Sequence, residues 1–180
     1  MAEISPLQTV DEVDVSVGVG TGNGRVIALV ASPSAQSEGW APGAAHRLAS
    51  SWGAEGRRVI LADGGVDQPS LHRVAGIPNR EGLVDVALYG ASLARVSRSV
   101  GGYVLITAGT AVAEPTAVAR STRWHRVAAD VPGLGVTLLV YLRDEEPWAA
   151  AFLDSVDDIV FLEDEGESPQ DTWDLTMGKG

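Results

Sequence analysis

The chain has 180 residues and a formal net charge of −11, and this length favours a single domain of ordinary size. It has no cysteine and only three scattered histidines, which excludes disulfides and thiolate metal sites and argues against a zinc centre. No apolar run approaches the roughly 18 residues that a membrane span requires, and residues 1–15 lack the pattern of a secretory signal. We therefore expect a cytoplasmic protein that holds no metal and does not insert into a membrane.

The acidic residues are concentrated at the two ends of the chain. Residues 1–24 contain four acids and no base, and residues 163–180 contain six acids and one lysine. The sequence therefore predicts a flexible acidic arm over residues 1–24, an α/β domain over 25–162 and a disordered acidic tail over 163–180. Four valines alternate with other residues over 13–19, which leaves open that the arm adds a strand to a sheet. Because the central part is nearly neutral, nothing supports nucleic acid as a partner.

Five short runs rich in valine, isoleucine and leucine follow in the central part. They lack polar alternation, which is typical of strands covered on both faces, and they span residues 25–31, 57–63, 102–108, 135–142 and 157–163. The segments between them have the length of crossover helices and span residues 42–52, 82–100, 115–131 and 146–155. This alternation predicts an α/β fold, a three-layer sandwich around a mainly parallel sheet of five or more strands.

The stretch after the second run carries the most distinctive motif. Asp63 ends the strand, Pro69-Ser70-Leu71-His72 and Pro78-Asn79 follow, and Gly82-Leu83-Val84-Asp85-Val86 opens the next segment. In this order, the elements resemble the bacterial tyrosine kinases of exopolysaccharide systems, members of the MinD/ParA-like P-loop class. The resemblance covers about residues 25–120. It implies a P-loop NTPase-like fold, with the loop after the first strand at the Walker A position and residues 103–109 at the Walker B position.

The departures from that family fall on the positions of its catalytic residues. A phosphate-binding loop needs a lysine for the β- and γ-phosphates, but Lys179 is the only lysine among the 180 residues. The resemblance places Trp40 near where that ammonium belongs, and Pro42 lacks an N–H at the helix start. The second strand keeps Asp63 but not the family's second aspartate, and residues 107–110 lack the Walker B aspartate. Because phosphoryl transfer depends on placed charges, we expect a degenerate member without ATPase or kinase activity, catalytic residues or a cofactor.

Two alternatives to a wholly inactive domain remain open at this stage. The chain could bind a nucleotide without hydrolysing it, as a regulator of exopolysaccharide biosynthesis or export, through the vestigial loop residues Ser34, Ser37, Gly39 and Trp40 together with Asp63. It could also be an active enzyme whose lysine comes from another chain. For Asp63 alone, a role in capping a turn or helix is the more common one.

A basic stretch in the predicted helix over 115–131 suggests a protein partner instead. Arg120, Arg123 and Arg126 follow at three-residue steps with Trp124 between them, and arginine beside tryptophan is typical of interfaces. Trp173 in the acidic tail is a further candidate contact. A solvated helix face, or a dock for the acidic tail itself, is the alternative for the arginines. The resemblance implies a partner that is a membrane protein or membrane complex, with this chain held at the inner membrane face through it.

Overall fold

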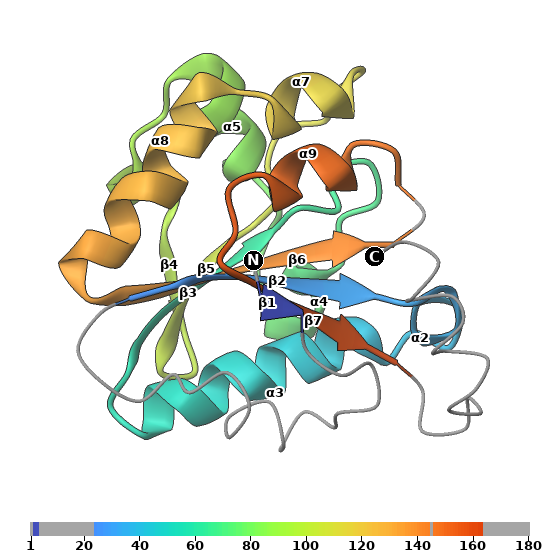
Figure 1. The fold of residues 1–180 in the computed structure, drawn as a ribbon, viewed down its shortest axis with the longest axis vertical. Coiled ribbons are helices and arrows are strands. Elements are labelled where there is room, and N and C mark those ends of the chain that lie inside the picture. The colour runs from blue at the N-terminus through green and yellow to red at the C-terminus, as the bar shows by residue number, and fades with distance from the viewer. Residues whose placement is uncertain (1, 4–23, 145, 164–180) are drawn as a thin grey trace.

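The computed structural model describes residues 2–3, 24–144 and 146–163. Seven strands of these residues form one sheet in the order β1-β7-β2-β6-β3-β5-β4 (Figure 1). Their bounds are β1 (Ala2–Glu3), β2 (Val26–Ala31), β3 (Arg58–Asp63), β4 (Arg98–Val100), β5 (Tyr103–Ile106), β6 (Val136–Arg143) and β7 (Asp158–Leu162). All neighbours in the sheet are parallel except β4 and β5. The five predicted strands are confirmed, and the sheet is extended by β1 and β4.

Helices cover both faces of this sheet. They are α2 (Pro33–Ser37), α3 (Ala41–Ala54), α4 (Leu71–Ala75), α5 (Leu83–Tyr89), α6 (Leu93–Val96), α7 (Pro115–Ala119), α8 (Thr122–Asp130), the 3-10 helix η1 (Val131–Leu134) and α9 (Ala149–Leu153). Helices α3 and α4 lie on one face, and α5, α7, α8 and α9 lie on the other (Figure 1). The predicted three-layer α/β sandwich is therefore confirmed.

The interior strand β2, which lies between β7 and β6, shows why the pattern of apolar residues predicts this arrangement. All six of its residues are buried. Successive side chains of a strand point to opposite faces, so Val26, Ala28 and Val30 join the core beneath α5 and α8, while the alternate residues join the core beneath α3. A strand without polar alternation is thus explained by helices on both sides.

The predicted helix over residues 82–100 is not continuous: it is divided into α5, α6 and the strand β4. Gly90 has a φ of 74° and ends α5, and Ser92 caps the short helix α6 with its hydroxyl, which accepts the N–H of Arg95. The chain then turns into β4, because Gly101 and Gly102 both have positive φ angles and form a tight turn to β5. Gly90 and the two adjacent glycines were visible signals for these breaks.

Two other predicted helices are shorter or broken. The segment over 115–131 divides at Ser121, whose hydroxyl accepts the N–H of Trp124 and starts α8 as a new helix. The segment over 146–155 contains only the five residues of α9. In both cases the prediction identified the connection correctly but not the bounds of its helices.

The two ends of the chain bear on the predicted domain bounds. Ala2 and Glu3 pair in parallel with Asp158 and Ile159 of β7, so this part of the predicted flexible arm forms a strand. The valines over 13–19 and the acidic tail, Trp173 included, lie outside the described residues. Within the part of the chain that the structure describes, no helix combines the length and apolar character needed to span a membrane.

Candidate functional site

The segment after β2 is a closed helical turn. Ser32 begins it, and the Ser32 hydroxyl accepts the N–H of Ala35 at 3.2 Å while Pro33 occupies the first turn. The backbone N–H groups of Gln36, Glu38 and Gly39 donate to the carbonyls of Ser32, Ser34 and Gln36, at 3.0–3.1 Å. These N–H groups are therefore already bonded inside the turn, whereas a phosphate-binding loop directs its N–H groups at the ligand.

Arg143, at the end of β6, ties this turn to the sheet. The Gln36 carboxamide donates to the Ala31 carbonyl at 2.7 Å and accepts from Arg143 Nε at 2.8 Å. The Arg143 guanidinium also lies 3.0 Å from Glu146 and 3.4 Å from Asp67. Sequence reasoning missed Arg143, although its position directly after an apolar strand run was a signal, since ligands of parallel sheets bind at that edge.

A cavity of about 710 Å³ opens beside the turn, at the carboxyl ends of β2, β3 and β6. It is lined by Pro33, Gln36, Ser37, Gly39, Pro42, Gln68, Pro69, Ser70, Arg73, Val74, Tyr141 and Arg143. Of the predicted loop residues, only Ser37 and Gly39 contribute to this lining. Trp40 instead precedes α3 and packs against the core on that face, and it does not contribute to the lining of this cavity. The lining contains two guanidinium groups and no carboxylate.

Asp63, at the end of β3, holds the turn that follows it. One carboxylate oxygen accepts the N–H of Gly65 at 3.0 Å, and the other accepts those of Ser70 and Leu71 at 3.0 and 3.1 Å. Asp63 is fully buried, and burial raises its pKa to about 6 although these hydrogen bonds and Arg143 act to lower it. The interpretation of Asp63 as a turn and helix cap is therefore confirmed, and the carboxylate is absent from the cavity lining.

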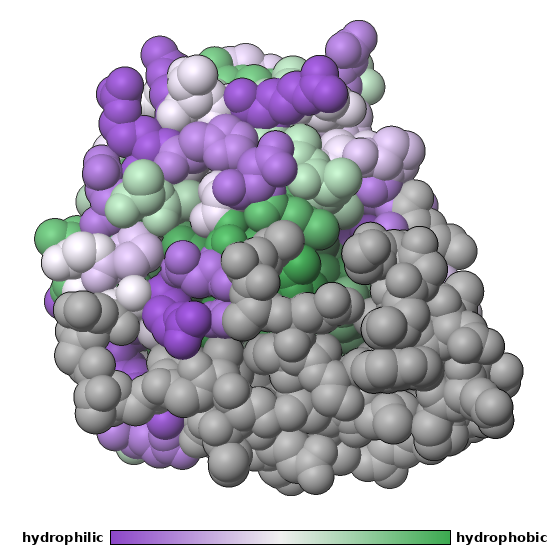
Figure 2. All heavy atoms as spheres, viewed as in Figure 1, coloured by the Kyte–Doolittle hydropathy of each residue, from purple (hydrophilic) through white to green (hydrophobic). Residues whose placement is uncertain are grey.

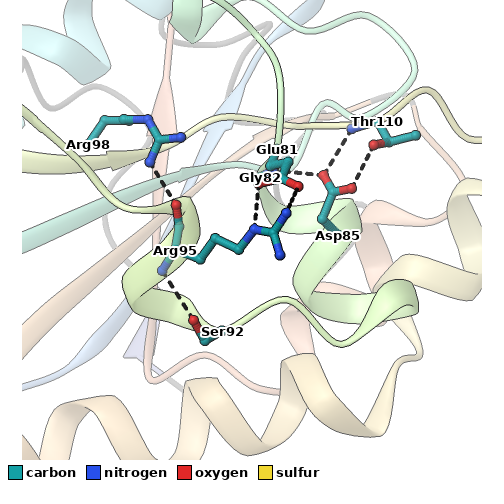
Figure 3. A network of polar contacts seen from close by, with 7 residues as sticks. All are labelled: Glu81, Gly82, Asp85, Ser92, Arg95, Arg98 and Thr110. Atoms are coloured by element: carbon teal, nitrogen blue, oxygen red, sulfur yellow. Dashed lines mark hydrogen bonds and ion pairs between the residues drawn. The ribbon is translucent and has the colours of Figure 1, made fainter.

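The end of β5 is clamped to the start of α5 by a second buried carboxylate (Figure 3). Asp85 accepts hydrogen bonds from the N–H of Gly82 at 2.8 Å and from the N–H and hydroxyl of Thr110 at 3.1 and 2.6 Å. Burial raises the pKa of Asp85, but the hydrogen bonds from Thr110 and Gly82 outweigh burial and leave the pKa below its ordinary value. The motif that carries the family resemblance thus performs a structural task here.

At the same clamp, the backbone at Gly82 packs so closely against the end of β5 that only glycine fits at this position. A Cβ on Gly82 would collide with the carbonyl oxygen of Thr107. The Asn79 carboxamide donates to the Gly109 carbonyl at 3.1 Å and accepts the Gly109 N–H at 2.7 Å. Beside the clamp, Glu81 and Arg95 form an exposed ion pair with two parallel hydrogen bonds (Figure 3).

Comparison with solved structures identifies the architecture. The kinase domain of the Escherichia coli tyrosine kinase ETK superposes with a TM-score of 0.80 at 14% identity, covering 96% of this chain and 69% of that one. The chimerical protein CapA2B2 gives 0.76 at 16% identity, covering 94% and 75%. The septum site-determining protein MinD of Pyrococcus horikoshii, in complex with Mg-ADP, gives 0.65 at 17% identity, covering 86% and 65%. No protein-family model and no curated protein matches the chain.

The chain has a P-loop NTPase-like fold. In this fold the connection after the first core strand carries the phosphate-binding loop, and in this chain that connection is the helical turn α2, tied to β6 through Arg143. Gly109 and Thr110, which follow β5, belong to the structural clamp. No group of three potential metal ligands occurs among the residues that the structure describes.

The predicted partner-binding residues divide into two groups. Arg120, Arg123 and Arg126 are exposed. Trp124 is completely buried and packs edge-on against Phe152, with ring centroids 6.2 Å apart. The prediction of Trp124 as a surface contact is therefore wrong, because the amphipathic helix α8 turns Trp124 toward the core and Arg123 and Arg126 toward solvent, while Arg120 precedes this helix.

Proposed function

We propose that this chain is a non-catalytic P-loop NTPase-like domain that acts as a protein-binding structural or regulatory subunit of a larger, membrane-associated complex. The observation that carries the proposal is the helical turn α2, in which the N–H groups of Ala35, Gln36, Glu38 and Gly39 bond within the turn. The fold similarity to tyrosine kinase domains, together with the resemblance in sequence to those of exopolysaccharide systems, supports a place in such a system.

The charges of the site support the same conclusion. The only lysine of the 180 residues is Lys179, and the one cation anchored at the turn, Arg143, faces two acidic partners, Asp67 and Glu146. Asp63 uses both carboxylate oxygens on backbone N–H groups. Catalysis of phosphoryl transfer depends almost wholly on charges positioned around the phosphates and the metal. A site whose charged groups already neutralise one another supplies little of that stabilisation.

Nucleotide-dependent thermal unfolding tests this proposal. A ligand at about 100 times its dissociation constant stabilises a folded protein by about 2.7 kcal/mol, which raises the melting temperature by several degrees. We expect no rise with ATP or ADP and Mg²⁺ at about millimolar concentration, and no ATP hydrolysis above that of a protein-free blank. Hydrolysis by the purified chain that is abolished in Arg143→Ala would refute the proposal.

A second candidate function is nucleotide binding without hydrolysis. It is favoured by the cavity of about 710 Å³ at the nucleotide position of the fold and by the two arginines in its lining. Under this candidate, ATP or ADP raises the melting temperature, the rise is lost in Arg73→Glu, and no phosphate is released. Arg47→Glu, a change of the same charge on α3 outside the cavity lining, is the matched control and should keep the full rise.

A further inference from the structure

We propose that Tyr89, Arg120, Arg123 and Arg126, which we call the arginine surface, bind an acidic segment of a partner protein. This inference rests on the proposed protein-binding function and names the chemistry of the partner. All four side chains are exposed. Figure 2 shows hydrophilic side chains in the upper part of the molecule, over the region of α7 and α8.

The arginines of this surface differ from four other arginines of the chain, whose charge is neutralised by an acidic residue. Arg25, Arg57, Arg95 and Arg143 each form an ion pair with an acidic residue. Within the described ranges, the side chains of Arg120, Arg123 and Arg126 form no hydrogen bond or ion pair. Arg123 and Arg126 lie three residues apart on α8, so their like charges repel each other. Such a cluster stands out in a chain with 24 acids and 13 bases.

The helix α8, which carries Arg123 and Arg126, is held firmly in place, and Arg120 ends the preceding helix α7. The Ser121 hydroxyl accepts the N–H of Trp124 and donates to the Ala87 carbonyl of α5 at 2.7 Å. His125 contacts the Ala119 carbonyl through Nε2 at 2.9 Å, and Trp124 is anchored in the core. The backbone under the guanidinium groups is therefore ordered before any partner binds, which lowers the entropy cost of association.

An exposed aromatic ring accompanies the charges. Tyr89 is 65% exposed, one of the few large apolar side chains at the surface of the described residues. The Arg123 guanidinium lies against Gly90, the next residue, since a Cβ there would come within 2.9 Å of its Nη1. An aromatic ring beside arginine is the composition of interface hot spots, and guanidinium forks bind carboxylates with two parallel hydrogen bonds. The surface thus fits a segment that carries several aspartates or glutamates.

Binding of a fluorescein-labelled peptide of about ten glutamates, at about 50 mM salt where screening is weak, tests the inference by fluorescence anisotropy. The double variant Arg123→Glu/Arg126→Glu should weaken binding by about tenfold or more, and Tyr89→Ala by about threefold. The matched control is Arg47→Glu/Arg80→Glu, which changes the net charge equally at two other exposed arginines. It should weaken binding by less than about threefold, because distant surface charges are screened.

Three results would overturn the inference. The first is that the unmodified chain does not bind the peptide. The second is that the two double variants weaken peptide binding equally. The third is that the chain binds only to vesicles that contain phosphatidylserine, which would make the arginine surface a membrane contact. Failure of the proposed function can be distinguished from failure of this inference, because stabilisation of the protein by ATP and hydrolysis of ATP are both measured without the peptide. A chain that hydrolyses ATP and still binds the peptide through Arg123 and Arg126 would refute the first proposal and support this one.

Discussion

The pH dependence of stability tests the environment of Asp63. This carboxyl group is fully buried, and burial raises its pKa to about 6 from an ordinary value of 3.8. Between these two pH values, the folded protein keeps a proton that the unfolded chain has lost. The free energy of unfolding therefore decreases as the pH rises through this interval. The contribution is fully present below about pH 4 and is lost by about pH 7.

The structure gives the size of this effect. The two pKa values are about 2 apart, and a tenfold change in proton affinity corresponds to about 1.4 kcal/mol. Asp63 should thus lower the free energy of unfolding by about 3 kcal/mol between about pH 4 and about pH 7. The variant Asp63→Asn has the shape of the protonated carboxyl and cannot ionise, so its stability should lack this decrease. It starts from a lower stability, because its amide nitrogen replaces one of the two oxygens that together accept the N–H groups of Gly65, Ser70 and Leu71.

Urea unfolding followed by tryptophan fluorescence measures the effect, since Trp52 and Trp124 are buried in the fold. The quantity to compare is the difference between the unmodified chain and Asp63→Asn at each pH, because burial also raises the pKa of Asp158. Asp85→Asn is the control. The pKa of Asp85 lies below its ordinary value, so its difference from the unmodified chain should stay constant over the same interval. A difference for Asp63→Asn that is also constant would refute the argument from burial.

Three substitutions test the clamp and the core by chemical denaturation. Gly82→Ala should destabilise by about 1–3 kcal/mol because the new Cβ meets the Thr107 carbonyl oxygen; an unchanged urea midpoint would contradict this contact. Asn79→Ala removes both hydrogen bonds to Gly109 and should cost about 1–3 kcal/mol, measured in the same way. Trp124→Ala should lower the free energy of unfolding by about 3–5 kcal/mol, because the ring is completely buried. A decrease of less than about 1 kcal/mol would contradict this burial.

The core strands could be predicted because burial on both faces leaves a direct mark on the sequence. The runs containing β2, β3, β5, β6 and β7 are continuous and apolar, as expected for strands that helices cover on both faces. Their alternation with helical segments is typical of a parallel α/β sheet. The short edge strands lack that mark. In β4, Arg98 and Ser99 are exposed and Val100 is half-buried, so their pattern is that of a loop, and only the following glycine pair indicates a turn.

The site was harder to predict because its contacts join distant parts of the chain. Gln36 and Arg143 are 107 residues apart and bond side chain to side chain, a pairing that no local pattern reveals. The turn α2 itself could have been predicted, since a serine followed by a proline, here Ser32 and Pro33, commonly begins a helix. The resemblance to kinases concerns the types of residue at the charged positions, and it does not predict the backbone conformation of the loop.

The conformation of α2 also limits what a single lysine substitution could achieve at this loop. Returning a lysine to the connection between β2 and α3 would add a cation, but the N–H groups of residues 35, 36, 38 and 39 would still be bonded to Ser32, Ser34 and Gln36. Phosphate could reach them only if the turn unwound and Gln36 released both Ala31 and Arg143. If the proposed function is correct, an engineered phosphate-binding loop in this chain would therefore require a new backbone conformation as well as a lysine.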